Sequence, residues 1–272
     1  MTPYQAIALD MDGTLLTRDH RISTATREAL EEARRRGLKV ILVTGRHYMM
    51  ARPFHHELGL DTPIICSNGA YLYDPAHDCI VRGDPLPKPA LATLLEVLEG
   101  ESMGALIHLS EGIAYLGCQE QVTKMRGWSA RQPEHLNIAL LPLEERPDLL
   151  AESVWKFELF GDDPAQLHDV VASRVQPLPL NQDWAAPYAI ELVERRCSKG
   201  NRLTQWAASE GIDMAQIVAF GDNNNDISMF AQVGLAVAMG NAAPQIRAQA
   251  HKVTADHNED GIALALQRWV LA

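Results

Sequence analysis

Cysteine is scarce in this chain of 272 residues, and long hydrophobic runs are missing from it. Its four cysteines are scattered, and no two of them have the spacing of a metal-binding pair. We therefore expect free thiols in the core. No apolar run approaches the ~20 residues that a membrane-spanning helix requires. The N-terminus also lacks the basic start of a secretory signal. These absences predict a cytoplasmic protein with no membrane partner.

Positive charge is also in short supply. Lysine and arginine number 24 against 35 acidic residues, which gives a net charge of −11. Nucleic-acid binding requires surplus cations to face the phosphate backbone, so the balance argues against nucleic acid as a partner. A small phosphorylated substrate needs only a few local cations and stays compatible with this charge. The sequence carries no signal for an oligomeric state.

Short apolar strands alternate with helices at both ends of the chain. Strands are expected at 6–10, 39–43, 63–66, 216–220, 235–238 and 252–254, with helices between them. This alternation predicts an α/β fold with a doubly wound parallel sheet and helices on both faces. The hairpin expected at 70–82 ends the first run of this pattern.

A different pattern occupies the middle of the chain. Three prolines, Pro85, Pro87 and Pro89, indicate a boundary, and the segment after them reads as an antiparallel α+β domain. We therefore expect a core made of residues 1–83 and 188–272, with a domain of residues 84–187 inserted into it. Its three tryptophans, Trp128, Trp155 and Trp184, are more typical of core packing than of a ligand site.

The chemistry is concentrated in Asp10-Met11-Asp12-Gly13-Thr14, which follows the first expected strand. Side chains alternate along a strand, so Asp10 and Asp12 project the same way. Two carboxylates held so close repel each other and favour a bound cation. Magnesium takes oxygen ligands of this kind. An ordinary strand-to-turn junction is the alternative interpretation, since Asp and Gly are common turn residues.

Other polar loops share the same position in the expected sheet. Ligands of open α/β sheets bind outside the carboxyl ends of the strands, where these loops converge. Thr44 offers a hydroxyl and Gly45 an unobstructed N–H, both suited to phosphate oxygens. Lys199 adds a positive charge at a helix start. A loop rich in carboxylates and amides completes the group, with Asp222, Asn225 and Asp226 as its candidate residues.

In this order the motifs resemble those of the haloacid dehalogenase (HAD) superfamily. The matching residues are Asp10-Met11-Asp12-Gly13-Thr14, Thr44, Lys199, and Gly221-Asp222 through Asp226. The large insertion resembles the C2-type cap of the Cof-type (subfamily IIB) phosphatases, and Asn68-Gly69-Ala70 fits that branch. The resemblance therefore implies a HAD-like Rossmannoid core with an inserted α+β cap.

The same resemblance implies a role for each matching residue. Asp10 would be the nucleophile and Asp12 the general acid and base. Mg²⁺ would be held by Asp10, the main-chain carbonyl of Asp12, and Asp222. Phosphate would be bound by Met11, Thr44, Gly45, Lys199 and Asn225. Asp226 would orient Lys199 or the metal's waters, and helix N-capping is an equally compatible role for it.

Narrower resemblances point to a substrate. The stretches 44–47, 154–157 and 197–200 are similar to those of bacterial phosphatases that act on pyridoxal phosphate. The resemblance thus implies a phosphatase of small phosphorylated metabolites, with pyridoxal 5′-phosphate favoured. A sugar-phosphate phosphatase or phosphomutase is the alternative within the fold. A non-catalytic sensor of a phosphorylated metabolite is the alternative outside enzymes, and the intact candidate nucleophile counts against it.

Three histidines near these motifs could also have a role in the site. His47 follows the Thr44-Gly45 loop. That position is equally compatible with a contact to substrate and with no such contact. His55 and His56 lie within an expected helix without metal-ligand geometry, and we expect both to be solvated.

Overall fold

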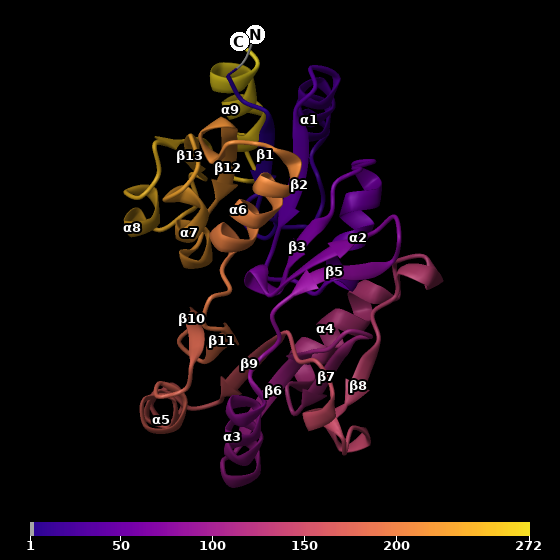
Figure 1. Ribbon diagram of the computed structural model, residues 1–272, viewed down its shortest axis with the longest axis vertical. Helices are drawn as coiled ribbons and strands as arrows, with labels where there is room; N and C mark the ends of the chain where they lie inside the picture. Colours follow the sequence, from indigo (N-terminus) through magenta and orange to yellow (C-terminus); the bar gives the residue numbers. More distant parts are fainter. Residues whose placement is uncertain (1–2) are drawn as a thin grey trace.

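An eight-stranded sheet forms one lobe of the computed structural model, which describes residues 3–272 (Figure 1). The strand order is β14-β13-β12-β1-β2-β3-β4-β5, and the six strands from β14 to β3 are parallel. β4 and β5 add an antiparallel hairpin at one edge. The strands are β1 (Ala6–Leu9), β2 (Lys39–Val43), β3 (Ile64–Cys66), β4 (Tyr71–Asp74), β5 (Cys79–Gly83), β12 (Ile217–Gly221), β13 (Leu235–Ala238) and β14 (Lys252–Val253).

Helices cover both faces of this sheet, as predicted for a doubly wound fold. β1 shows why: Ile7 and Leu9 pack into a cluster with α1, α2 and α9, while Ala6 and Ala8 pack into another with α6, α7 and α8. Alternate side chains of a strand point to opposite faces, so a strand buried on both faces must be apolar throughout. The helices are α1 (Thr24–Arg35), α2 (Tyr48–Glu57), α6 (Lys199–Glu210), α7 (Ile227–Phe230), α8 (Pro244–Arg247) and α9 (Gly261–Ala265).

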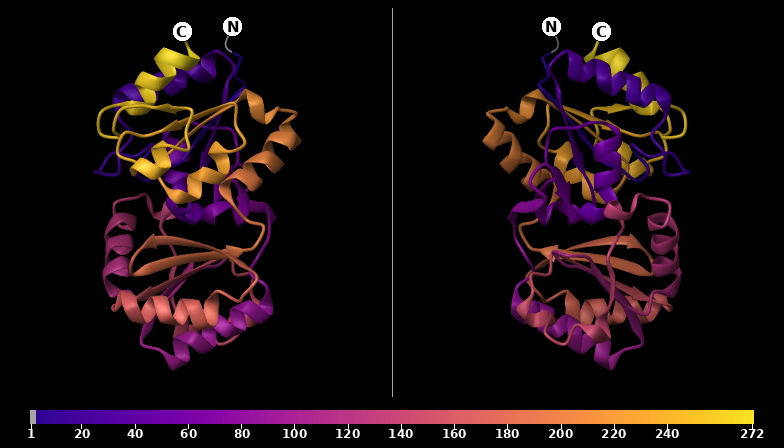
Figure 2. Two further views of the ribbon diagram at one scale, coloured as in Figure 1. Left: turned by 90° about the vertical axis from the view of Figure 1, so that its left-hand side faces the viewer. Right: turned by 90° about the vertical axis from the view of Figure 1, so that its right-hand side faces the viewer.

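The second lobe is built on a six-stranded sheet with the order β10-β11-β9-β6-β7-β8. Its pairs are antiparallel except β7 with β8. Figure 2 shows helices on the face of this sheet that is turned away from the first lobe. The elements are α3 (Lys88–Gly100), β6 (Met103–His108), β7 (Ile113–Leu116), α4 (Gln119–Ser129), β8 (Leu140–Pro142), β9 (Lys156–Gly161), α5 (Pro164–Val170), β10 (Leu180–Ala186) and β11 (Ala189–Glu194).

The second boundary between the lobes differs from the expected one. Residues 187 and 188 lie in the turn between β10 and β11, which pair with each other, and β11 also pairs with β9. Strand β11 therefore belongs to the second sheet, although the expected division places it in the core. We propose the same two-part division with the core resuming after Glu194. The alternation in β11 resembles that of a core strand, and only its pairing assigns it to a sheet.

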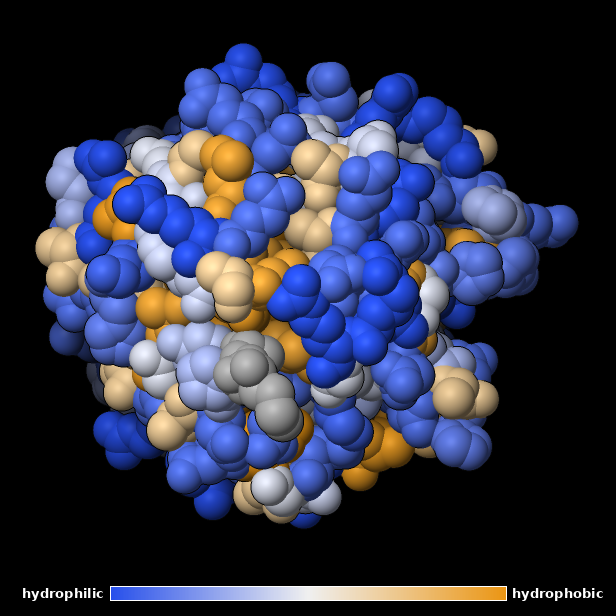
Figure 3. Space-filling view, turned by 90° about the horizontal axis from the view of Figure 1, so that it is seen from above, coloured by the Kyte–Doolittle hydropathy of each residue, from blue (hydrophilic) through white to orange (hydrophobic). Residues whose placement is uncertain are grey.

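The end of the core lobe has an ordinary surface. Seen from the end of the core lobe, the surface is mostly hydrophilic with hydrophobic residues between (Figure 3). Among residues 3–272, no helix has the length and apolar character needed to span a bilayer. The four cysteines are free thiols. Cys66 and Cys197 are buried as expected, but the expectation of a core position is wrong for the exposed Cys79 and for Cys118, which is only partly buried.

Candidate active site

Asp10 follows β1 at the carboxyl edge of the core sheet, and Lys199 contacts it from the first turn of α6. The Lys199 Nζ donates to Oδ1 of Asp10 at 2.7 Å and to Oδ1 of Asp226 at 2.6 Å. All three side chains are buried. Burial raises the pKa of Asp10 well above its ordinary value, and the nearby Lys199 ammonium opposes this rise. Burial alone would lower the pKa of Lys199, but the two carboxylates raise it, so the lysine is charged.

Asp226 organises the loop that follows β12. Its Oδ2 accepts hydrogen bonds from the backbone N–H groups of Asp222 at 2.9 Å and of Asn223 at 3.0 Å. Asn223 caps the short helical turn that contains Asp226, and the two form a capping box. Asp226 therefore contacts Lys199, but the expected N-cap role is wrong for it: Asn223 is the N-cap, and Asp226 is the residue three positions later that bonds back to it.

A metal fits beside Asp10. Oxygens of Asp10, Asp222 and Asp226 all lie within 4.8 Å of one another. Asp222 accepts from the Thr14 hydroxyl at 3.1 Å. Burial and the nearby Asp226 carboxylate raise the pKa of Asp222 to about 6. A set of carboxylate oxygens that raise one another's pKa is the donor set that a hard divalent cation prefers.

The Asp12 carboxylate lies against Arg46. Arg46 donates from Nε to Oδ2 of Asp12 at 2.6 Å and from Nη2 to Oδ1, which makes a bidentate ion pair. Although partial burial works in the other direction, the guanidinium lowers the pKa of Asp12 below its ordinary value. The Asp12 side chain is therefore not part of the acidic metal cluster, which agrees with a main-chain ligand role. Its partner Arg46 was given no role from the sequence.

The candidate phosphate donors lie in the loops that follow β1, β2 and β12. Thr44 is buried, and its hydroxyl accepts from the N–H of Arg46. Asn225 donates from Nδ2 to Oδ1 of Asn68 at 3.0 Å, while its own Oδ1 is buried without a partner within residues 3–272. A methyl group on Gly45 would lie 2.9 Å from the same Asn68 oxygen, so a larger residue there would displace the Asn68 side chain. Met11 follows β1 with its side chain buried in the core.

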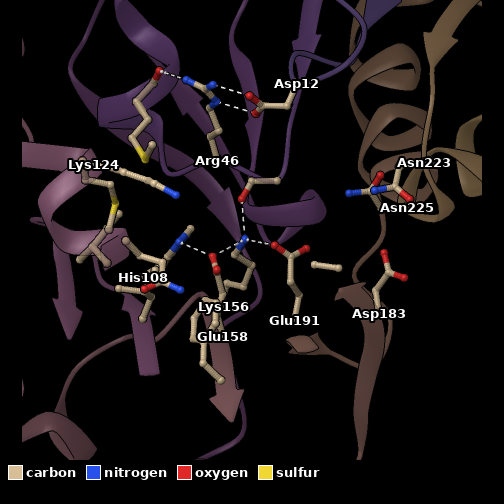
Figure 4. Close-up of a pocket in the computed structure, with 18 of the residues that line it drawn as sticks. Asp12, Arg46, His108, Lys124, Lys156, Glu158, Asp183, Glu191, Asn223 and Asn225 are labelled. Atoms are coloured by element: carbon tan, nitrogen blue, oxygen red, sulfur yellow. Dashed lines mark hydrogen bonds and ion pairs between the residues drawn. The ribbon is translucent and has the colours of Figure 1, made fainter. Parts of the chain in front are cut away.

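The second lobe contributes a charged wall opposite these residues (Figure 4). Lys156 is buried, and its Nζ donates to Glu158 at 2.7 Å, to Glu191 at 2.8 Å and to the carbonyl of Gly45 at 2.7 Å. Burial alone would raise the pKa of Glu158, but Lys156 and His108 lower it to about 2. Glu158 is therefore ionised beside a charged lysine that also pairs with Glu191.

These contacts connect the two lobes. Glu191 accepts from Nδ2 of Asn68 at 2.5 Å, and Nδ1 of His108 lies 2.7 Å from the Ser67 hydroxyl. A continuous path of hydrogen bonds thus runs from the second lobe through Asn68 to Asn225. The sequence carried a signal for part of this wall: Lys156, Glu158 and Phe160 alternate with apolar residues, as expected for a strand with one face toward a site.

A cleft of about 470 Å³ lies between the core loops and this wall. Asp10, Asp12, Gly45 and Asn225 line it from the core. Its remaining lining is both polar and apolar, with Met50, Leu106, Ile113, Met125 and Phe160 as the main apolar members. The structure therefore brings four of the predicted core residues to one opening, and much of its far side belongs to the inserted segment.

The tryptophans and histidines named in the sequence analysis lie outside the cleft. Trp155 packs on Tyr71 and Trp128 on Phe54, and neither lines the cleft. His47 is fully buried as the N-cap of α2 and donates from Nε2 to the carbonyl of Leu109 at 2.7 Å. Burial lowers its pKa to about 3, so it is a neutral structural group. The expectation of a solvated His55 is wrong, because it is buried and hydrogen-bonded to the Thr62 carbonyl. Its neighbour His56 is exposed.

Comparison with known proteins agrees with this geometry. A family model described as haloacid dehalogenase-like hydrolase matches residues 7–266. The chain belongs to the haloacid dehalogenase-like hydrolases. Among solved structures, a haloacid dehalogenase-like hydrolase from B. subtilis superimposes with a TM-score of 0.84 at 26% identity, covering 98% of this chain and 100% of that one. A sugar phosphatase of HAD subclass IIB gives a TM-score of 0.79 at 25% identity, with coverages of 97% and 98%.

Two curated relatives are phosphatases that act on different compounds. The chain is 37% identical to the pyridoxal phosphate phosphatase YbhA of Escherichia coli, over 95% of this chain and 96% of that protein. It is 30% identical to the 5-amino-6-(5-phospho-D-ribitylamino)uracil phosphatase YitU of Bacillus subtilis, over 98% and 97%. The protein is therefore a HAD phosphatase of the Cof type, and its fold is the one predicted from the sequence.

Proposed function

We propose that this phosphatase hydrolyses small phosphorylated metabolites through a phosphorylated Asp10. The observation that carries the proposal is the position of Lys199, which holds Asp10 from the buried side while the cleft opens in front of it. A carboxylate so placed can attack a phosphorus atom, and a fixed cation beside it neutralises charge that develops on the phosphoryl oxygens.

The steps follow from the residues present. The Asp10 carboxylate attacks phosphorus, the ester bond breaks, and the leaving oxygen takes a proton from Asp12. Water then attacks the aspartyl-phosphate, Asp12 takes its proton, and inorganic phosphate leaves with Asp10 restored. Because Arg46 holds Asp12 in this structure, the Asp12 carboxylate has to leave Arg46 to reach the leaving oxygen.

Magnesium is the proposed cofactor. Asp10, Asp222 and the main-chain carbonyl of Asp12 would hold it, while Asp226 is engaged with Lys199 and two backbone N–H groups. When bound, the ion would supply positive charge against the transferring phosphoryl group. Thr44, Gly45, Met11 and Asn225 would donate to the remaining phosphate oxygens.

Pyridoxal 5′-phosphate is the proposed favoured substrate. The support is the name of the 37% identical relative, together with a cleft that combines an apolar surface with a few charged groups. His108 and Lys156 of the inserted segment line this cleft, whereas Trp128, Trp155 and Tyr115 do not. Recognition would therefore come from Phe160 and its aliphatic neighbours together with polar anchors.

Phosphate release tests the activity. The wild-type protein should release phosphate from p-nitrophenyl phosphate with Mg²⁺ and lose that activity in excess chelator. Asp10→Asn should abolish turnover without unfolding the protein, because the amide is nearly isosteric but cannot attack phosphorus. Appreciable steady-state hydrolysis by a verified, non-deamidated Asp10→Asn protein would remove the nucleophile assignment.

A substrate panel tests the specificity. We expect kcat/KM for pyridoxal 5′-phosphate to exceed that for common hexose phosphates by at least about tenfold, or ~1.4 kcal/mol of transition-state discrimination. Equal or better turnover of hexose phosphates would leave the phosphatase activity in place and exclude this substrate preference.

A further inference from the structure

Asp183 lies in the wall of the cleft that faces the candidate phosphate site. It belongs to β10 and lines the cleft together with Ala185, Glu191 and Asn225. It also lines a second hollow of about 390 Å³ that reaches Lys199 from the other side. In Figure 4 its carboxylate points toward the side of Asn223 and Asn225, across the opening from Lys156. No motif of the sequence includes this residue.

Asp183 differs from the other charged residues that line the cleft. Each of those has an ion-pair or hydrogen-bond partner within residues 3–272: Arg46 holds Asp12, Lys124 contacts Glu120, and Lys156 holds Glu191. The Asp183 carboxylate has neither an ion pair nor a hydrogen bond in the same range, and no dashed line reaches it in Figure 4. Lys199 and Lys156 still act on Asp183 from a distance, but no donor contacts its carboxylate directly.

The neighbour across the strand pair makes this arrangement less favourable. Asp183 lies directly opposite Glu191 in the antiparallel pairing of β10 with β11. Like charges in that position destabilise a sheet. Glu191 is already satisfied by Lys156 and Asn68, so it cannot relieve Asp183. Burial, with the Glu191 carboxylate, raises the pKa of Asp183. A partly buried carboxylate with no donor is destabilising unless a ligand brings one.

We propose that Asp183 is a specificity residue that accepts a hydrogen bond from the leaving group of the substrate. This inference rests on the proposed phosphatase function of the cleft. The substrate class it names is a phosphate ester whose leaving group carries an N–H or O–H donor, such as a protonated ring nitrogen or a hydroxyl group. Phosphate esters without a donor leave the partly buried Asp183 unpaired and are disfavoured, because an unpaired polar group in a site discriminates against substrates that cannot pair with it.

The test compares donor-bearing and donor-free substrates. Asp183→Ala and Asp183→Asn are assayed with pyridoxal 5′-phosphate, glucose 6-phosphate and p-nitrophenyl phosphate, which has no donor. We expect Asp183→Ala to lower the kcat/KM ratio of pyridoxal 5′-phosphate to p-nitrophenyl phosphate at least tenfold, mainly through KM. Asp183→Asn, which keeps an acceptor oxygen, should restore part of the ratio. Asp162→Ala, an exposed carboxylate of the same lobe, is the matched control and should not change it.

The outcomes separate this inference from the proposed function. An unchanged ratio in Asp183→Ala, or an equal loss on all three substrates, overturns the role of Asp183. If the wild type hydrolyses p-nitrophenyl phosphate and glucose 6-phosphate but not pyridoxal 5′-phosphate, the proposed substrate preference is wrong. The effect of Asp183→Ala on the kcat/KM ratio of glucose 6-phosphate to p-nitrophenyl phosphate then tests the role of Asp183. If the folded wild type hydrolyses none of them, both the phosphatase proposal and the Asp183 inference fail.

Discussion

Lys156 pairs with two carboxylates where the lobes meet, and its replacement should strongly lower the free energy of unfolding. Lys156→Met keeps a side chain of similar length but takes away the charge and all three hydrogen bonds. Glu158 and Glu191 then face each other's charge without a cation, and the carbonyl of Gly45 loses its donor. Breaking a buried ion pair by removing one partner destabilises a protein by ~3–5 kcal/mol, chiefly because the other charge is left behind.

The structure places the expected value at the lower end of that range. Lys156 is 2% exposed, but the side chains of Glu158 and Glu191 are 17% and 16% exposed, so water reaches them in part. His108 also remains 3.1 Å from Glu158. We therefore expect Lys156→Met to lower the free energy of unfolding by about 3 kcal/mol, a large part of the 5–15 kcal/mol typical of a domain.

A second lysine of the same cleft supplies the matched control. Lys124 pairs with Glu120 at 2.6 Å, but both side chains are about three-quarters exposed. Water screens an ion pair that is this exposed, so Lys124→Met should leave the free energy of unfolding close to the wild-type value. The same substitution thus has different effects because one lysine is buried and the other is not.

Urea denaturation at neutral pH measures both variants against the wild type. A third variant, Lys156→Met with Glu158→Gln, should recover about 1 kcal/mol or more, since it removes one of the unpaired charges. A loss below about 1 kcal/mol in Lys156→Met, or a loss equal to that of Lys124→Met, would refute the argument from buried charge.

Two further predictions concern the core lobe. Asp12→Ala should keep the protein folded and its metal bound, because the proposed ligand is the main-chain carbonyl of Asp12. The variant should nevertheless turn over substrate roughly 10²–10⁴-fold more slowly. If calorimetry shows weakened Mg²⁺ binding and turnover is normal at high Mg²⁺, the Asp12 carboxylate is instead a metal ligand. His47→Asn keeps an N-cap on α2 but removes a group whose pKa is lowered to about 3 by burial. The stability that depends on a neutral His47 is complete above the unfolded pKa of ~6.5 and is lost as the pH falls toward 3. The stability gap between wild type and His47→Asn should therefore shrink by about 2 kcal/mol between pH 7 and pH 5 in urea titrations, and a gap independent of pH would contradict the assignment.

Much of the core lobe follows from local patterns in the sequence. The apolar runs before Asp10 and Gly221 predict buried strands because a strand covered on both faces has no place for polar side chains. Parallel strands end at one edge of a sheet, so the loops after them had to meet there. Asp10, Thr44 and Asp222 were found by that reasoning. Ser198 and Gly211, the observed caps of α6, are local signals of the same kind.

The tertiary structure decided which partner each charged side chain has. Nothing local distinguishes the exposed His56 from the buried His55, or the buried Lys156 from the exposed Lys124. Likewise the pairing of β11 with β9 and β10, rather than with the core sheet, depends on residues up to about 35 positions away. The physical reason is common to these cases. The local sequence pattern indicates the secondary-structure propensity of a segment and which of its faces is apolar. Burial and ion pairing depend on segments that only the folded chain brings together.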